Sequence, residues 1–252
     1  MCCVTELVRL ETADGTATIT LDSPHNRNAL SRALVSQLSQ ALDDSAADDT
    51  AKVVVLRSSG RVFCSGADMS EAATIGMEEG SRGLIALLRQ IVAHPKPVLA
   101  VLAGPVRAGG IGIIGACDVV VAAQEATFAF TEARLGLAPA AISLTTRARM
   151  TDRAASLTYL SGDTFDAVEA ARIGLVTEAV GADDLESTVE SVVASIAKST
   201  GQGLRETKRL LNAPLLADID ERGDDLAAMS ARLFGSEEAR EAMRAFLEKR
   251  SR

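Results

Sequence analysis

The feature that most constrains this chain is a glycine-rich segment between two apolar stretches. Residues 98–103 and 119–123 are short and apolar, as buried strands are, and four glycines fall between positions 109 and 115. Glycine destabilises a helix, so this density indicates that something comes very close to the backbone. A short helix beginning near Gly109 would direct unpaired N–H groups and its positive dipole end at that group. An anionic or polarised oxygen fits such a position.

The order of the predicted elements indicates an α/β fold. Residues 7–10 and 16–21 alternate apolar and polar side chains around Asp14-Gly15, which predicts a β-hairpin. Ser31 is a typical N-cap, and the leucines that follow it recur at helical spacing. Further strands are predicted at 52–57, 98–103, 119–123, 127–130 and 175–180, and helices at 84–92, 141–149, 151–160, 166–172, 184–198, 203–215, 219–233 and 236–249. This order predicts an α/β core over residues 1–195 and a helical C-terminal region over 196–252.

Composition limits the classes of partner. The chain has 252 residues, a net charge of -8 and no apolar run of membrane-spanning length. Nucleic acids and anionic membranes require a basic surface, so neither is expected as a partner. The four cysteines and two histidines have no metal-ligand spacing, so we expect no metal site. The N-terminus lacks the pattern of a signal peptide, and the expected location is cytoplasmic.

A second glycine-containing turn follows the strand at 52–57. Residues 63–68 and residues 108–112 each follow a strand and could each open a short helix. If the two strands are neighbours in one sheet, two backbone N–H groups converge and form an oxyanion hole without any special side chain. The alternative is that these are two unrelated tight turns.

Two other readings of these turns are disfavoured. Residues 110–115 spell a GxGxxG string, but the strand ends too early before it and the next strand begins too soon after it for a dinucleotide-binding unit. Cys64 or Ser65 could be a nucleophile, but the surrounding residues lack the nucleophile-elbow pattern and neither histidine has a reason to lie nearby. Small residues packed in a tight turn are the simpler interpretation.

Taken together, the motifs resemble those of the crotonase superfamily, which contains enoyl-CoA hydratases and isomerases. The resemblance rests on five segments in the same order and spacing along nearly the whole chain: residues 27–30, 63–69, 109–110 with 117–118, 132 with 135–139, and 245–250.

The resemblance implies a fold of repeated ββα units followed by a helical trimerisation region, in a homotrimer or homohexamer. It implies an acyl-CoA thioester as substrate and no separate cofactor. The backbone N–H groups of Ala67 and Gly109 would form the oxyanion hole, and Glu132 would carry protons. The residues implied to bind substrate and CoA are Arg27, Ala29, Leu30, Ala67, Asp68, Met69, Ser70, Gly109, Phe246 and Lys249.

The sequence departs from the family at the position of a second carboxylate. Hydratases of the family use two glutamates, and this chain has Gly112 at the first of these positions and Glu132 at the second. Addition of water needs a base and an acid, whereas one glutamate suffices for a 1,3-proton shift. Hydration is expected from the overall resemblance, 3-enoyl- to 2-enoyl-CoA isomerisation is the alternative, and a non-catalytic acyl-CoA-binding protein is a third possibility. The family often has glycines at residues 138–141 and this chain does not, so the sequence does not predict the shape of the acyl pocket.

Overall fold

The computed structural model describes residues 5–68, 71 and 77–250, without the side chains of residues 77 and 246–250. Its main sheet has six strands in the order β1-β2-β3-β4-β6-β9. The first pair is antiparallel, and every later neighbouring pair is parallel. The strands are β1 Val8–Ala13, β2 Thr16–Leu21, β3 Val53–Ser58, β4 Val98–Leu102, β6 Val119–Ala123 and β9 Glu178–Val180.

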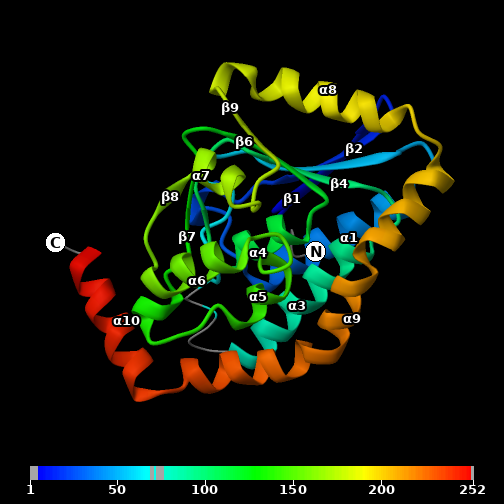
Figure 1. Cartoon of the computed structure of the whole chain (residues 1–252). Coiled ribbons are helices and arrows are strands. Elements are labelled where there is room, and N and C mark those ends of the chain that lie inside the picture. The colour runs from blue at the N-terminus through cyan, green and yellow to red at the C-terminus, as the bar shows by residue number, and fades with distance from the viewer. Residues whose placement is uncertain (1–4, 69–70, 72–76, 251–252) are drawn as a thin grey trace.

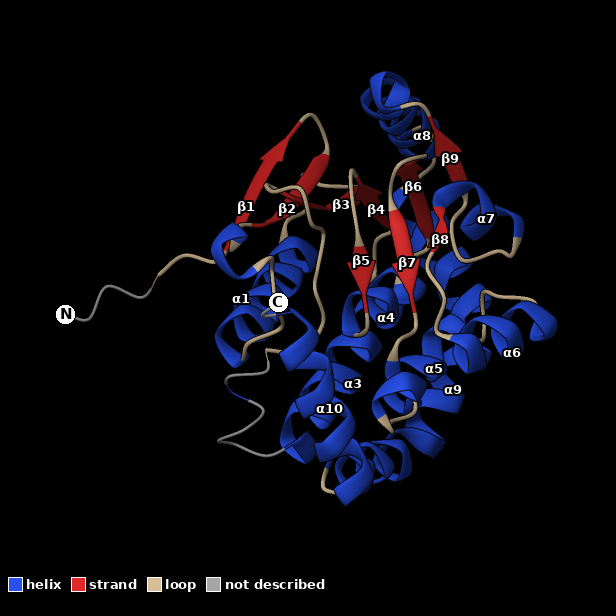
Figure 2. Cartoon of the chain, turned by 90° about the vertical axis from the view of Figure 1, so that its left-hand side faces the viewer, coloured by secondary structure: helices blue, strands red, loops and turns tan. Residues whose placement is uncertain are grey.

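A smaller sheet and a set of helices complete the fold (Figure 2). The small sheet consists of β5 Val106–Arg107, β7 Thr127–Ala129 and β8 Phe165–Asp166, in that order. The α-helices are α1 Arg32–Ala47, α3 Met77–Ala93, α4 Gly109–Ala116, α5 Ala140–Thr146, α6 Asp152–Ser161, α7 Ala167–Arg172, α8 Leu185–Ala197, α9 Gly201–Phe234 and α10 Glu237–Arg250. Short 3-10 helices lie at Pro24–Asn26, Glu132–Leu135 and Ala182–Asp184.

The two faces of the main sheet are covered by different helices (Figure 1). Helix α8 packs Leu185 and Val189 on one face, against Leu99 and other strand residues that point the same way. The opposite face belongs to the main hydrophobic core, to which α1 and α3 contribute apolar residues such as Leu38 and Leu88. Because both faces are covered at the centre of the sheet, β4 and β6 are apolar throughout, whereas β2, nearer the edge, alternates.

Three local predictions for the first half of the chain are confirmed. The hairpin forms with Asp14 and Gly15 at its turn, and both residues have positive φ angles of 49° and 78°. Ser31 caps α1, because its side chain accepts a hydrogen bond from Leu34 N at 3.2 Å. The predicted short helix begins at Gly109, directly after β5.

The prediction of two separate helices at 203–215 and 219–233 is wrong. One helix, α9, runs from Gly201 to Phe234 with Pro214 inside it. Proline removes one backbone hydrogen bond from a helix, but packing against the core outweighs this loss. Ile219, five residues beyond Pro214, is 2% exposed in the main core, and Arg89 of α3 pairs with Asp220 at 2.6 Å.

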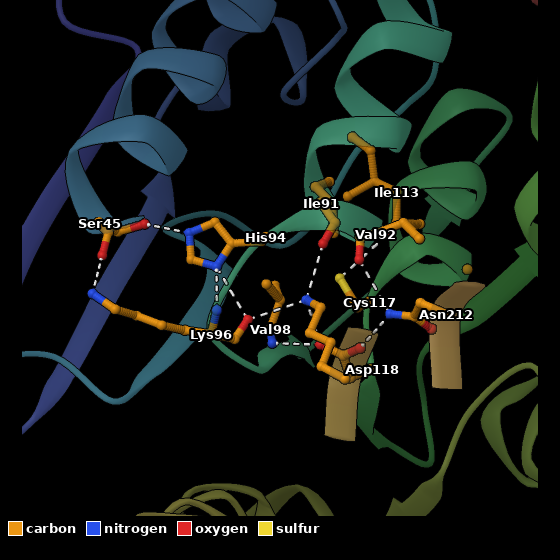
Figure 3. Close-up of polar contacts among 12 residues, drawn as sticks. Ser45, Ile91, Val92, His94, Lys96, Val98, Ile113, Cys117, Asp118 and Asn212 are labelled. Atoms are coloured by element: carbon orange, nitrogen blue, oxygen red, sulfur yellow. Dashed lines mark hydrogen bonds and ion pairs between the residues drawn. The ribbon is translucent and has the colours of Figure 1, made fainter. Parts of the chain in front are cut away.

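A buried polar cluster attaches α9 to the sheet (Figure 3). Lys208 Nζ lies 2.7 Å from Asp118 Oδ2 and donates to the carbonyl oxygens of Ile91 and Lys96 at 3.0 and 3.1 Å. Asn212 donates to Asp118 Oδ1 at 3.1 Å, and Val98 N donates to Asp118 Oδ2 at 2.8 Å. Burial lowers the pKa of Lys208 from its ordinary value, and the ion pair with Asp118 opposes that shift.

We expect Lys208→Met to lower the free energy of unfolding by about 3–5 kcal/mol, because it leaves the partly buried carboxylate of Asp118 without its counter-charge. Urea unfolding followed by circular dichroism measures the change. Lys198→Met, at an exposed lysine, is the matched control and should change the unfolding free energy by less than about 0.5 kcal/mol. Equal stability of the two variants would contradict a structural role for the buried ion pair.

Candidate active site

The N-terminus of α4 presents one backbone donor that the fold does not use. Ile111 N and Gly112 N both donate to Ala108 O, at 2.8 and 3.4 Å. Gly110 N lies against the thiol of Cys64. Within the described part of the chain, Gly109 N has no hydrogen-bond partner, and it occupies the helix position where the dipole favours an electronegative atom.

The turn at residues 63–68 lies directly beside this helix N-terminus. Phe63 N donates to Pro105 O at 3.0 Å, and Arg107 N donates to Cys64 O at 3.0 Å. A Cβ on Gly66 would lie 2.8 Å from Ala108 Cβ, and one on Gly110 would lie 2.6 Å from Cys64 Cβ. The two turns are therefore neighbours, as predicted, and glycine at both positions allows their backbones to meet.

A cavity of about 710 Å³ opens beside these two turns. Ala67 and Gly109 both line it, together with Leu30 and Asp68, which the sequence had also singled out. A side chain at position 109 would collide with Leu30, because its Cβ would lie 2.6 Å from Leu30 Cδ1. The remaining walls come from α1 and α3 and include Val35, Leu84, Leu87 and Gln90.

Glu132 is the carboxylate with the most unusual surroundings in the described structure. It begins the 3-10 helix Glu132–Leu135, and its Oε2 atom is buried without a hydrogen-bond partner. Burial raises its pKa to about 7. The pKa of Tyr159 is raised to about 12, first by burial and in part by the charge of Glu132, and helix α6, which carries Tyr159, packs against the 3-10 helix that begins at Glu132. A carboxyl group that titrates near neutral pH can both accept and donate a proton.

The comparisons with known proteins decide the family. Residues 11–252 match the family described as Enoyl-CoA hydratase/isomerase. The chain belongs to this family. It is similar to the crystal structure of an enoyl-CoA hydratase from Mycobacterium avium, with 46% identity, a TM-score of 0.92 and 98% of each chain covered.

Two further relatives agree with this assignment. The crystal structure of an enoyl-CoA hydratase from Mycobacterium avium subsp. paratuberculosis K-10 is 29% identical, with a TM-score of 0.86, and the match covers 98% of this chain and 97% of that one. Mevalonyl-coenzyme A hydratase sidH from Aspergillus fumigatus is 32% identical over 241 residues, which are 92% of this chain and 88% of that protein. The predicted crotonase fold, with its helical C-terminal region, and the predicted enzyme class are confirmed.

The other predicted site residues of this enoyl-CoA hydratase/isomerase family member either do not line the cavity or lie where their side chains are not described. Ala29 is buried and Arg27 is exposed in the loop before α1, and the carbonyl of Arg27 accepts from Ser65 N at 3.1 Å. Neither residue lines the 710 Å³ cavity, and neither does Glu132. Met69 and Ser70 lie outside the described residues. Phe246 and Lys249 fall in α10, where the backbone alone is described.

Two alternatives from the sequence, a dinucleotide-binding turn and a nucleophilic Cys64, find no support in the described residues. The GxGxxG string forms α4 itself rather than a turn before a helix. Burial raises the pKa of the Cys64 thiol to about 12, which does not suit a nucleophile. The described residues contain no cluster of metal ligands and no helix long and apolar enough to cross a membrane.

The sequence did not predict that residues of α1 and α3 line the cavity, nor that Tyr159 belongs to the surroundings of Glu132. The wall residues have the helical spacing of ordinary core residues, so nothing in their pattern separated them from packing. Tyr159 lies in α6, and its proximity to Glu132 depends on how α6 packs.

The raised pKa of Glu132 predicts a pH-dependent stability difference. Between its ordinary value of 4.5 and about 7, the unfolded chain ionises Glu132 while the folded chain keeps it protonated, so folding loses stability as the pH rises. The wild type loses this stability as the pH rises and Glu132→Gln does not. We therefore expect the free energy of unfolding of Glu132→Gln, relative to that of the wild type, to increase from pH 5 to pH 8 by about 3 kcal/mol at most. Urea unfolding at both pH values measures the gain.

Glu125→Gln is the control for this measurement, because Glu125 is an exposed carboxylate only a short way along the chain. Its stability difference from the wild type should not change between the two pH values. If Glu132→Gln behaved in the same way, the carboxyl group of Glu132 would not be buried as described.

Proposed function

We propose that this protein acts on the double bond of an enoyl-CoA, and that it stabilises the thioester enolate with the backbone N–H groups of Ala67 and Gly109. The observation that carries the proposal is that these two residues lie on neighbouring turns and line one cavity, with Gly109 N free to donate. Hydrogen bonds to the thioester oxygen lower the cost of negative charge on that oxygen when the α-carbon loses or gains a proton.

Glu132 is proposed as the group that moves this proton. Its pKa of about 7 lets the carboxylate remove a proton and the resulting acid return one near neutral pH. The buried, unpartnered Oε2 atom supports this role, since an unpaired buried carboxylate lowers stability and is retained at functional sites. We propose no cofactor beyond the CoA thioester that is the substrate.

Hydration of a 2-enoyl-CoA is the first candidate reaction, because the relatives reported above are named as hydratases. Isomerisation of a 3-enoyl-CoA to a 2-enoyl-CoA is the second candidate, because Gly112 stands where hydratases of the family have a second glutamate. In isomerisation, Glu132 would take a proton from C2 and return it to C4. In hydration, it would have to act on water and on C2 through a relayed proton.

The remaining features of the proposal concern binding and assembly. Arg27, Ala29, Leu30 and residues 67–70 would hold CoA, and Phe246 and Lys249 would contact its adenosine part. We further propose a homotrimer or homohexamer in the cytoplasm. Exposed apolar side chains on α6 and α9 support self-association, since large apolar residues in water favour burial in an interface: Leu157, Leu160, Leu210 and Leu211.

Replacement of the proposed proton carrier tests the reaction. We expect Glu132→Gln to lower kcat by about 10²–10⁴-fold, because the amide cannot exchange a proton with the substrate, while the Kd for acyl-CoA stays within about threefold. Glu125→Gln should retain wild-type kcat. Steady-state assays and calorimetric titration measure both quantities. Undiminished turnover in Glu132→Gln would exclude Glu132 as the proton carrier.

A product assay separates the candidate functions. We expect the wild-type protein to convert at least one substrate when 2-enoyl-CoA and 3-enoyl-CoA are offered separately and the products are resolved by chromatography and mass spectrometry. A hydroxyacyl-CoA product means hydration, and a shifted double bond alone means isomerisation. Binding of acyl-CoA without turnover of either substrate would instead support the non-catalytic alternative.

A further inference from the structure

Position 112 of α4 is in tight contact with Ile142 of α5. A Cβ added to Gly112 would lie 2.7 Å from Ile142 Cγ2 and 3.1 Å from Ile142 Cβ, and 3.4 Å from Leu88 Cδ1 of α3. Real Cβ atoms do not approach another carbon to 2.7 Å, so even alanine at position 112 requires Ile142 to move. The space that the first side-chain atom at position 112 would enter is therefore already filled.

Ile142 is poorly placed to give way. It is 4% exposed, and its side chain branches at Cβ, which restricts it to one strongly preferred rotamer in a helix. Helix α5 is also tied to α4 by a hydrogen bond from Thr145 Oγ1 to Gly112 O of 2.8 Å. Moving Ile142 away from position 112 would thus require either a strained rotamer or separation of two packed helices.

We propose that Ile142 is a specificity-determining residue, because its side chain fills the volume that an acidic side chain at position 112 would need and so leaves Glu132 to transfer protons alone. This inference rests on the proposed function. The glycine at position 112 and the isoleucine at position 142 then form one paired packing arrangement. Restoring a carboxylate at position 112 requires both positions to change.

The proton balance shows what this arrangement favours. Shifting a double bond moves one proton from C2 to C4 with no net gain or loss, so one carboxylate can complete the cycle. Adding water forms a C–O bond at C3 and a C–H bond at C2, and the water must lose a proton to a base while C2 receives one from an acid. A second carboxylate on α4 would supply the missing partner, and Ile142 excludes it.

Thermal unfolding of paired variants tests the packing. We expect Gly112→Ala to lower Tm by about 2–10 °C, as overpacking of a core does. Adding Ile142→Ala should relieve that loss, so that Gly112→Ala costs less than about 2 °C when it is introduced into the Ile142→Ala protein.

Gly115→Ala is the matched control. Position 115 lies one turn further along α4, and its Cβ would meet the Thr145 backbone and the Thr146 side chain rather than Ile142. Its loss in Tm should therefore be the same in the wild-type and Ile142→Ala backgrounds. A Gly112→Ala variant as stable as the wild type, or one that Ile142→Ala does not rescue, would overturn the proposal.

Product analysis tests the consequence for the reaction. We expect Gly112→Glu combined with Ile142→Ala to raise the ratio of hydroxyacyl-CoA to isomerised product on the order of tenfold over Ile142→Ala alone. The isosteric combination Gly112→Gln with Ile142→Ala should give no such rise. Gly112→Glu alone should be unstable or unchanged in product ratio. If this single variant raised hydration as much as the double variant, Ile142 would not exclude the carboxylate.

The two proposals fail in different ways. A wild-type protein that turns over no enoyl-CoA would contradict the proposed function, and the Tm measurements would still decide whether Ile142 excludes a side chain at position 112. Independent Tm effects of Gly112→Ala and Ile142→Ala in an active enzyme would contradict the role of Ile142 while leaving Glu132 as the proposed proton carrier.

Discussion

Residues 63–66 and 105–108 run side by side and are joined by backbone hydrogen bonds, such as the 3.0 Å bond from Arg107 N to Cys64 O. This contact requires glycine at positions 66 and 110, because a Cβ at either would collide with the facing segment. The contact places Ala67 and the start of α4 on one cavity. The parallel strands β3 and β4 precede the two turns and end at the same edge of the sheet, so the sheet itself sets the distance between the turns.

The glycines of helix α4 contact different parts of the structure along its length. Its first residues, Gly109 and Gly110, meet Leu30 and Cys64, and they leave one backbone donor beside the cavity. Its later glycines face α5, where Gly112 contacts Ile142 and Gly115 contacts Thr145. A helix with glycines along one face can approach a neighbouring helix unusually closely, and α4 packs against α5 in this way. At position 112, therefore, α4 is packed directly against α5 and borders no empty space.

Two sites with buried ionisable side chains differ in how well their polar atoms are paired. Lys208 is buried, Asp118 is partly buried, and the pair is well satisfied, since four hydrogen bonds surround it in addition to the ion pair; it holds the C-terminal helix α9 on the core. The Oε2 atom of Glu132 is buried without a hydrogen-bond partner, and its pKa of about 7 reflects the cost of ionising it in the folded state. The paired charges of Lys208 and Asp118 therefore suit the attachment of a helix, whereas the poorly paired carboxyl group of Glu132 suits proton transfer.

The sequence by itself determined the strands of the main sheet, the hairpin at Asp14-Gly15, the Ser31 cap and the start of α4, because each depends on residues close together along the chain. It did not predict β5 and β8, two-residue strands of the small sheet, which are too short to show a periodic pattern. It also singled out Ala67, Gly109 and Glu132, through motifs whose spacing is distinctive. Only the tertiary structure decided that α9 continues through Pro214, because contacts with α3 outweigh the local cost of proline. It likewise decided that Ile142 occupies the space beside Gly112, because side-chain volumes from separate helices compete for space only once the helices pack.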